Sequence, residues 1–273
     1  LDRALRRIEG WTDQQVVNRQ LLLARAALHA GFAYGLLAEG FCSAAVDEGP
    51  ELQTPQLLDS AEARFTRALT LATALNNAEL ANAARVGRAR VRLYRGNTAG
   101  AIADATPVPV TFVFNAAMAA TDPRRENRVF QQNNQTFNVS VAPAYRGLTV
   151  GGVADRRVVV SDSGRNASDQ VTRLWVQRKY GSLAAPLPLA TGVEAQLILA
   201  EAQGAAGGGV EILNALRARA GVALPALSAA EVSAFGATVF EERRRELFLQ
   251  GARWYDLRRG MLPLVPARQT AYA

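Results

Sequence analysis

The chain has 273 residues, 49% of them hydrophobic, which is enough for one large domain or two small ones. Its formal net charge is +7, but acidic residues are interleaved with the arginines, and this pattern disfavours nucleic-acid binding. A single cysteine and a single histidine exclude an intrachain disulfide and a zinc site made of these two residue types. No run of 18 apolar residues occurs, so we expect no transmembrane helix.

Residues 1–106 are expected to form tetratricopeptide-like helical hairpins. Segment 21–41 carries small residues three or four positions apart, and this spacing lets two helices approach closely. These residues are Ala24, Ala27, Gly31 and Gly35. In the next segment, 58–75, Asp59 and Glu62 have the spacing of a capping box, which predicts a helix start at that point.

The tetratricopeptide character depends on two features. Within 58–75, Ala61, Phe65 and Ala68 match the second helix of such a repeat. Further on, Gly96 and Asn97 predict a turn between two helices. Ala101 follows Ala61 by about 40 positions rather than the 34 of a regular repeat. An ordinary helix bundle is therefore the alternative.

Residues 107–190 are expected to form a loop-rich segment with short β-strands. Alternating or β-branched residues predict strands at 135–141, 156–162 and 172–180, with polar turns between them. Four aromatic residues of this segment are candidates for ligand binding, since a flat ring can stack on a sugar and polar neighbours can bind its hydroxyls. They are Phe130, Tyr145, Trp175 and Tyr180. The alternative is that these rings fill small cores beneath the loops.

Residues 191–273 are expected to be helical again. Ser228 and Glu231 have the spacing of a capping box at the start of a helix over 228–250. On that helix Arg244 shares a face with apolar residues, so we predict that it is buried and paired. Local ion pairs are expected of Arg245 with Glu241 and Glu242. Further on, Asp256 is expected to bind Arg253, Arg258 or Arg259.

The same stretch carries a family signature. The string EERRRELFLQGARWYDLRR closely resembles the C-terminal motif of the SusD/RagB family, with Gln250 in place of the usual glutamate. EAQLILAEAQ and LNALRARAGV upstream are also similar to family helices. The resemblance gives a structural role to Glu242, Arg243, Arg244, Glu246, Gly251, Arg253, Trp254, Asp256 and Arg258.

The resemblance implies a mainly α, SusD-like fold in which 1–273 is one domain. It implies a cell-surface, outer-membrane lipoprotein that binds a glycan, a peptide or another polar nutrient without cleaving it. The implied partner is a TonB-dependent transporter of the SusC/RagA type, with no nucleic acid involved. Compared with the family, the chain is expected to be a fragment without the N-terminal lipoprotein signal, whose lipid anchor would be the only membrane contact, and without the C-terminal end. A soluble tetratricopeptide-like scaffold for a protein partner is the alternative.

No combination of residues predicts catalysis, a cofactor or a metal. His29 and Cys42 are not obviously convergent, so a Cys–His pair is not expected. Glu241 and Glu242 are adjacent and would diverge by about 100° on a helix, which does not suit the facing carboxylates of a glycosidase. Asp47 and Glu48 offer too few oxygen ligands for calcium.

Overall fold

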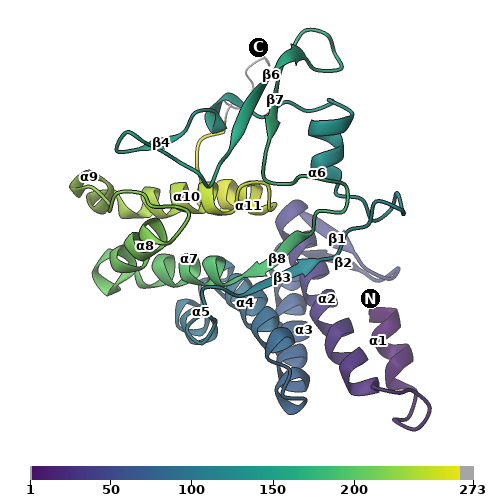
Figure 1. Ribbon diagram of the computed structural model, residues 1–273. Helices are drawn as coiled ribbons and strands as arrows, with labels where there is room; N and C mark the ends of the chain where they lie inside the picture. Colours follow the sequence, from purple (N-terminus) through teal and green to yellow (C-terminus); the bar gives the residue numbers. More distant parts are fainter. Residues whose placement is uncertain (1, 265–273) are drawn as a thin grey trace. The chain divides into compact units, whose positions relative to one another are not determined.

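The computed structural model describes residues 2–264, and they form two compact units. The first unit contains residues up to Phe114, Ala190–Gly209 and the described residues from Arg253 on. The second contains Asn115–Leu189 and Val210–Ala252. The units do not follow the three consecutive segments expected from the sequence, because residues of 191–273 are divided between them. Figure 1 shows the helices and strands coloured along the chain.

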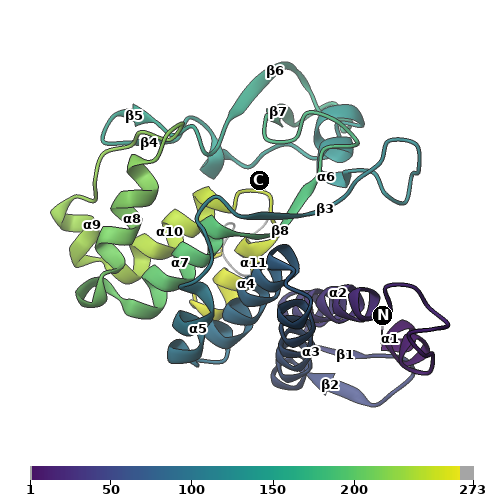
Figure 2. The same cartoon turned by 60° about the horizontal axis from the view of Figure 1, so that its bottom comes forward.

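The first unit is helical, as the tetratricopeptide-like pattern predicts. Its helices are α1 (Asp2–Glu9), α2 (Arg19–Gly40), α3 (Thr54–Ala74), α4 (Ala78–Tyr94), α5 (Thr98–Ala105), α7 (Gly192–Gln203) and α11 (Ala252–Arg259), with the short turn η3 (Ala205–Gly207). β1 (Ser43–Ala45) and β2 (Glu51–Gln53) form an antiparallel pair between α2 and α3. Helices α2, α3 and α4 lie side by side in Figures 1 and 2.

The core of the first unit forms around Phe65 of α3. A Cβ atom added at Gly31 of α2 would lie 2.7 Å from the Phe65 ring, and one added at Gly87 of α4 would lie 2.4 Å from it. The ring therefore fills space that only glycine leaves open on both neighbouring helices. Phe32 contributes a T-shaped contact at 5.0 Å between ring centroids. The small residues thus allow the close helix packing that the sequence predicts.

Two further features of this unit can be compared with the sequence. Gly96 has a positive φ of 76° and Asn97 caps α5, so the predicted turn is confirmed. The predicted cap at Asp59 is wrong, because α3 already begins at Thr54. There the side chain of Gln53 accepts a hydrogen bond from the backbone N–H of Gln56, and the Gln56 side chain accepts one from the N–H of Gln53.

Helix α2 is, by length and hydropathy, able to cross a membrane, although its sequence is not an unbroken apolar run. In this fold 56% of its apolar window is buried inside the protein. Ala24, Ala27 and Leu28 are fully buried. The apolar character of α2 is therefore explained by its position in the core of the first unit.

The second unit combines short strands with helices. Its strands are β4 (Thr149–Val150), β5 (Val153–Ala154), β6 (Val160–Asn166) and β7 (Arg173–Gln177). Its helices and turns are α6 (Arg128–Phe130), η1 (Gln131–Gln135), η2 (Pro143–Tyr145), α8 (Gly209–Ala218), α9 (Ala229–Ser233) and α10 (Phe235–Glu246). β4 pairs with β5 and β6 with β7, both antiparallel. At the unit boundaries of the chain, β3 (Val113–Ala116) pairs with β8 (Leu187–Thr191).

One predicted strand of this unit is absent. Segment 135–141 is not a strand, because Phe137 adopts a left-handed φ of 59° that interrupts extended backbone. The segment still runs beside β7, where the N–H of Val141 donates to the carbonyl of Trp175 at 3.0 Å. The strand expected at 172–180 is confirmed as β7, whereas the one expected at 156–162 begins only at Val160.

Amide side chains of η1 also hydrogen-bond to β7. The π-helical turn η1 continues α6 and contains the sequence QQNNQ. Asn133 donates to the carbonyl of Trp175 at 2.9 Å and accepts from the N–H of Gln177 at 2.8 Å. Ser140 accepts from the N–H of Trp175 at 2.9 Å. The side of β7 that does not face β6 is therefore satisfied by these side chains and by Val141.

The capping box predicted at Ser228 is present, but the helix that follows it is short. Both hydrogen bonds of the box form between Ser228 and Glu231. α9 then ends at Ser233, and the carbonyl of Glu231 accepts from the Thr238 hydroxyl at 2.8 Å. The single helix expected over 228–250 is therefore two helices, α9 and α10.

Candidate functional site

The signature residues of α10 form a buried ionic cluster in the second unit. Glu242 is 1% exposed and accepts from Arg217 of α8 at 2.7 Å and from Arg157 at 2.5 Å. Glu246 accepts from Arg219 at 2.6 Å and from Arg157 at 3.1 Å. Two carboxylates one helical turn apart thus hold α8 and the segment before β6 against α10.

Asp155 extends this cluster. Its carboxylate binds Arg157 at 2.8 Å and Arg245 at 3.0 Å. Burial alone would raise the pKa of Asp155, but the hydrogen bonds from Arg157 and Arg245 lower it to about 2. The carboxylate therefore stays ionised at neutral pH, as paired buried charges require.

The turn after α10 is held by two residues that follow β7. Lys179 donates to the carbonyl of Phe248 at 2.6 Å, and the Tyr180 hydroxyl donates to the carbonyl of Leu249 at 3.1 Å. Burial lowers the pKa of Lys179 to about 8 and raises that of Tyr180 to about 12. Both side chains therefore donate to carbonyls of the turn that follows α10.

The predicted interactions of α10 are partly confirmed. Arg245 pairs with Glu241 at 2.7 Å as expected, but Glu242 pairs with Arg157 and Arg217 instead of Arg245. The Arg244 side chain is 11% exposed and binds Glu241 at 2.6 Å. Its predicted burial and pairing are therefore confirmed, although the neighbouring Arg243 is more deeply buried.

The signature residues after α10 lie in or next to α11. Gly251 has a positive φ of 87°, which suits glycine at this turn. Asp256 is buried and accepts from Arg259 at 2.7 Å, one of the three arginines expected. Arg258 donates to the carbonyl of Glu39 at 3.1 Å. Trp254 is exposed. Arg253, the remaining signature residue, is half-buried in α11.

The four candidate aromatic residues have different environments. Tyr145 and Trp175 are half-buried and both pack against the cluster of Val141, Val158 and Phe248. Phe130 is half-buried in α6. Tyr180 is only 4% exposed, so its ring has no free face for a ligand.

Each of the two rings on that cluster has an arginine beside it. The guanidinium carbon of Arg244 lies 4.7 Å from the centroid of the Tyr145 ring, and that of Arg146 lies 4.9 Å from the centroid of the Trp175 ring. Arg146 also donates to the carbonyl of Val141 at 2.7 Å. Partly exposed rings and hydrogen-bond donors therefore occur together on this part of the second unit.

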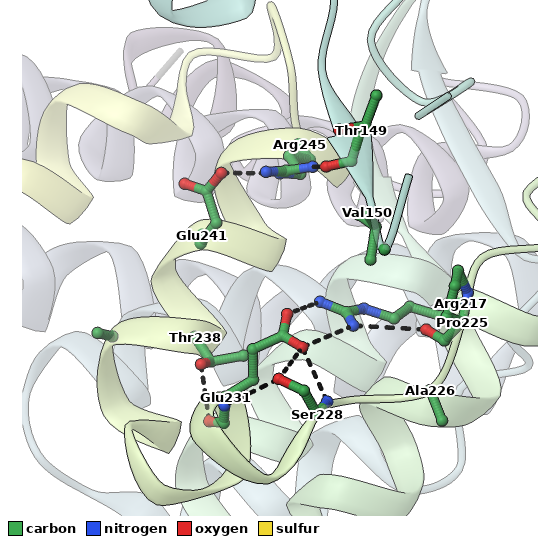
Figure 3. A pocket seen from close by; sticks show the side chains of 12 residues that line it. Thr149, Val150, Arg217, Pro225, Ala226, Ser228, Glu231, Thr238, Glu241 and Arg245 are labelled. Carbon is green, nitrogen blue, oxygen red and sulfur yellow. Dashed lines mark hydrogen bonds and ion pairs between the residues drawn. The ribbon is translucent and has the colours of Figure 1, made fainter. Parts of the chain in front are cut away.

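A pocket of about 550 Å³ lies in the same unit (Figure 3). Arg217, Ser228 and Glu231 line one side of it, while Thr149, Glu241 and Arg245 line the other. The pKa of Glu231 is lowered to about 2 because its side chain accepts hydrogen bonds from Arg217. Sequence reasoning missed this pocket. A usable signal was Arg217 itself, which lies one turn after the buried Leu213 on the inner face of α8.

The described residues contain no group of three or more His, Cys, Asp or Glu side chains arranged to hold a metal ion. Cys42 is exposed, and the His29 ring lies 6.0 Å from that of Phe114. Burial lowers the pKa of His29.

Residues 193–270 match the model of the SusD family. None of the curated proteins compared with the chain matches it. Several solved structures share its fold at low sequence identity. A SusD-like carbohydrate-binding protein from Bacteroides vulgatus superposes with a TM-score of 0.64 at 16% identity, covering 89% of this chain and 63% of that one.

Two further solved structures agree. A SusD-like carbohydrate-binding protein from Bacteroides fragilis gives a TM-score of 0.61 at 15% identity, covering 89% of this chain and 67% of that one. The surface glycan-binding protein A from Bacteroides uniformis gives 0.63 at 15% identity, covering 94% and 70%. The chain thus spans roughly two thirds of the length of these structures. The family resemblance and the mainly α fold predicted from the sequence are both confirmed: the chain has a SusD-like fold, and its residues 193–270 match the SusD family model.

Proposed function

We propose that this chain is the ligand-binding part of a non-catalytic surface protein that captures a glycan or a similar polar oligomer. The observation that carries this proposal is the match of residues 193–270 to the SusD family on a SusD-like fold. The three structures named above are all described as carbohydrate-binding or glycan-binding proteins. The fold alone does not assign a ligand, because glycan binding also requires a suitable surface on the protein.

The second unit has a surface of this kind around Tyr145 and Trp175. A sugar ring presents C–H groups that pack on an aromatic face, while its hydroxyls need nearby hydrogen-bond donors. Tyr145 and Trp175 are partly exposed, and Arg244 and Arg146 lie beside them. We infer that Tyr145 and Trp175 are the main contact residues and that Phe130 is secondary. Tyr180 holds the turn after α10 through Leu249 rather than contacting a ligand.

The binding test uses the full-length protein, isothermal titration calorimetry and a panel of soluble glycans and peptides. Trp175→Ala and Tyr145→Ala should each weaken binding of the glycan that is found by tenfold or more. Trp254→Ala is the matched control, because this ring is 51% exposed but belongs to the first unit. Unchanged affinity in both ring variants would show that the ligand binds elsewhere. No binding by any glycan would count against the proposed function itself.

We also propose that the protein acts without turnover, in the outer membrane, beside a TonB-dependent transporter of the SusC/RagA type. Incubation of the bound glycan with the protein should return it unchanged by chromatography, and a shortened product would contradict a binding role. Gentle solubilisation of membranes should co-purify the full-length protein with a transporter. Recovery of the full-length protein in the cytoplasmic fraction would contradict the location.

A further inference from the structure

The pocket in Figure 3 has a charge pattern that selects against ions. Its wall carries two arginines, Arg217 and Arg245, and two glutamates, Glu231 and Glu241. Arg217 binds Glu231 at 2.5 Å, and Arg245 binds Glu241 at 2.7 Å. The formal charge of the wall is therefore zero. An anion would compete with these glutamates for the arginines, and a cation would compete with the arginines for the glutamates.

Some hydrogen-bonding groups of the wall remain available for a neutral ligand. The Nη2 atom of Arg245 has no hydrogen-bond partner among residues 2–264, since Nε and Nη1 make the bonds to Glu241, Asp155 and the carbonyl of Thr149. The Thr149 hydroxyl likewise has none within the described chain. The Thr238 hydroxyl donates to the carbonyl of Glu231 and can still accept. Such a mixture of donors and acceptors suits hydroxyl groups, which both donate and accept.

The size and remaining lining of the pocket limit the ligand further. A volume of about 550 Å³ falls within the usual range for small-molecule sites. Val150, Pro225 and Ala237 add apolar surface between the polar groups. This combination fits a ring that carries hydroxyls at its edge and C–H groups on its faces.

We propose that this pocket seats one neutral sugar unit of the glycan that the protein captures. The inference rests on the proposed function and adds a second binding element to the surface formed by Tyr145 and Trp175. Arg244 links the two, because it binds Glu241 on the pocket wall and lies over the Tyr145 ring. A glycan bound at the two rings can place one sugar unit in this pocket, which accepts a neutral sugar and disfavours a charged one.

The decisive experiment fills the pocket without removing any of its ion pairs. Ala237 is exposed on the pocket wall, so Ala237→Trp in the full-length protein should occupy the pocket and lower glycan affinity at least tenfold. Ala230→Trp is the matched control, because Ala230 is also exposed but does not line the pocket. Its affinity should stay within twofold of the wild type. Thr149→Val, which replaces the hydroxyl with a methyl group of similar size, is the second variant and should weaken binding severalfold.

The class of sugar is tested with methyl glucoside, methyl mannoside, methyl galactoside and methyl glucuronide, observed by shifts of the Gly151 amide signal. At least one neutral glycoside should shift this signal more strongly than the glucuronide does. A stronger response to the glucuronide, or no response to any neutral glycoside, would overturn the assignment. If a glycan binds but neither Ala237→Trp nor Thr149→Val weakens it, the pocket proposal is wrong and the proposed function stands. If no glycan binds the wild type, both are wrong.

Discussion

The two units of this protein are stabilised in different ways. The first packs three long helices around Phe65, with glycine at the two positions that face its ring, and its ion pairs, such as Arg90 with Glu194, join a buried carboxylate to an arginine that stays partly exposed. The second holds short helices and loops together through arginine–carboxylate contacts, several of which are buried on both sides, as at Arg157 and Glu242. Apolar packing depends on shape alone, whereas a buried ion pair fails when either partner is lost. The two units should therefore differ in which substitutions they tolerate.

The largest expected effect is the loss of Glu242. Glu242→Ala leaves Arg217 and Arg157 buried with an incomplete set of partners and should lower the free energy of unfolding of the second unit by about 3–5 kcal/mol. Urea titration followed by Trp175 fluorescence measures this, with Trp11 and Trp254 replaced by Phe. Glu211→Ala is the control, since Glu211 is exposed on α8 and should change the value by less than about 0.5 kcal/mol. A loss below about 1 kcal/mol for Glu242→Ala would contradict the claim that buried ion pairs stabilise the second unit.

The next effect concerns the first unit. Gly87→Ala places a methyl group 2.4 Å from the Phe65 ring and should cost about 1–3 kcal/mol, because the buried ring must move. Gly35→Ala, with no atom within 4 Å of its added Cβ, should instead stabilise the unit by about 0.5–1 kcal/mol. Thermal unfolding by circular dichroism compares the two. Equal effects of the two changes would mean that helix spacing does not depend on Phe65.

The next largest effect is expected from acid, which should destabilise the second unit more than the first. The pKa values of Asp155 and Glu231 are lowered to about 2 in the folded second unit. The stability they contribute is therefore complete above their unfolded pKa values of about 4 and is lost as the pH falls towards 2. In the described part of the first unit the pKa of Asp2 is also lowered to about 2, because its carboxylate accepts hydrogen bonds from Arg64, and the pKa of Glu62 is lowered by Arg92 and Arg95. Urea midpoints measured from pH 6 to pH 2.5 should fall more steeply for the second unit, and Asp155→Asn should flatten that slope.

The smallest effect is expected at Arg244. Its partner Glu241 is 37% exposed and keeps a second contact to Arg245, so Arg244→Ala should cost only about 1 kcal/mol. A loss of about 3–5 kcal/mol would be expected only if the change left a buried partner uncompensated. A measured loss in that higher range would place Arg244 in the same class as Glu242.

The sequence predicts the first unit better than the second for a physical reason. Helix α2, the turn at Gly96 and the small residues around Phe65 all follow from local spacing. The partners of Glu242 do not. Arg157 lies 85 positions away, in a segment with no regular periodicity, and only the folded chain brings the two together.

The candidate site, too, could be predicted only in part from the sequence. Composition identifies the aromatic residues between 107 and 190, but it does not distinguish the buried Tyr180 from the partly exposed Trp175. The strand predicted at 135–141 is absent because Phe137 adopts a left-handed φ, which no propensity predicts for a bulky aromatic residue. The capping box predicted at Ser228 is confirmed, because its two residues, Ser228 and Glu231, are only three positions apart in the sequence.

The amide contacts along β7 have a consequence for solubility. A strand with unpaired N–H and C=O groups along one side can add a strand from another molecule and so start aggregation. Here Asn133, Ser140 and Val141 already bind the backbone of Trp175 and Gln177 on the side away from β6. Asn133 of the sequence QQNNQ, together with Ser140 and Val141, therefore blocks strand addition at β7, so that this hairpin can lie at a protein surface without recruiting a second copy.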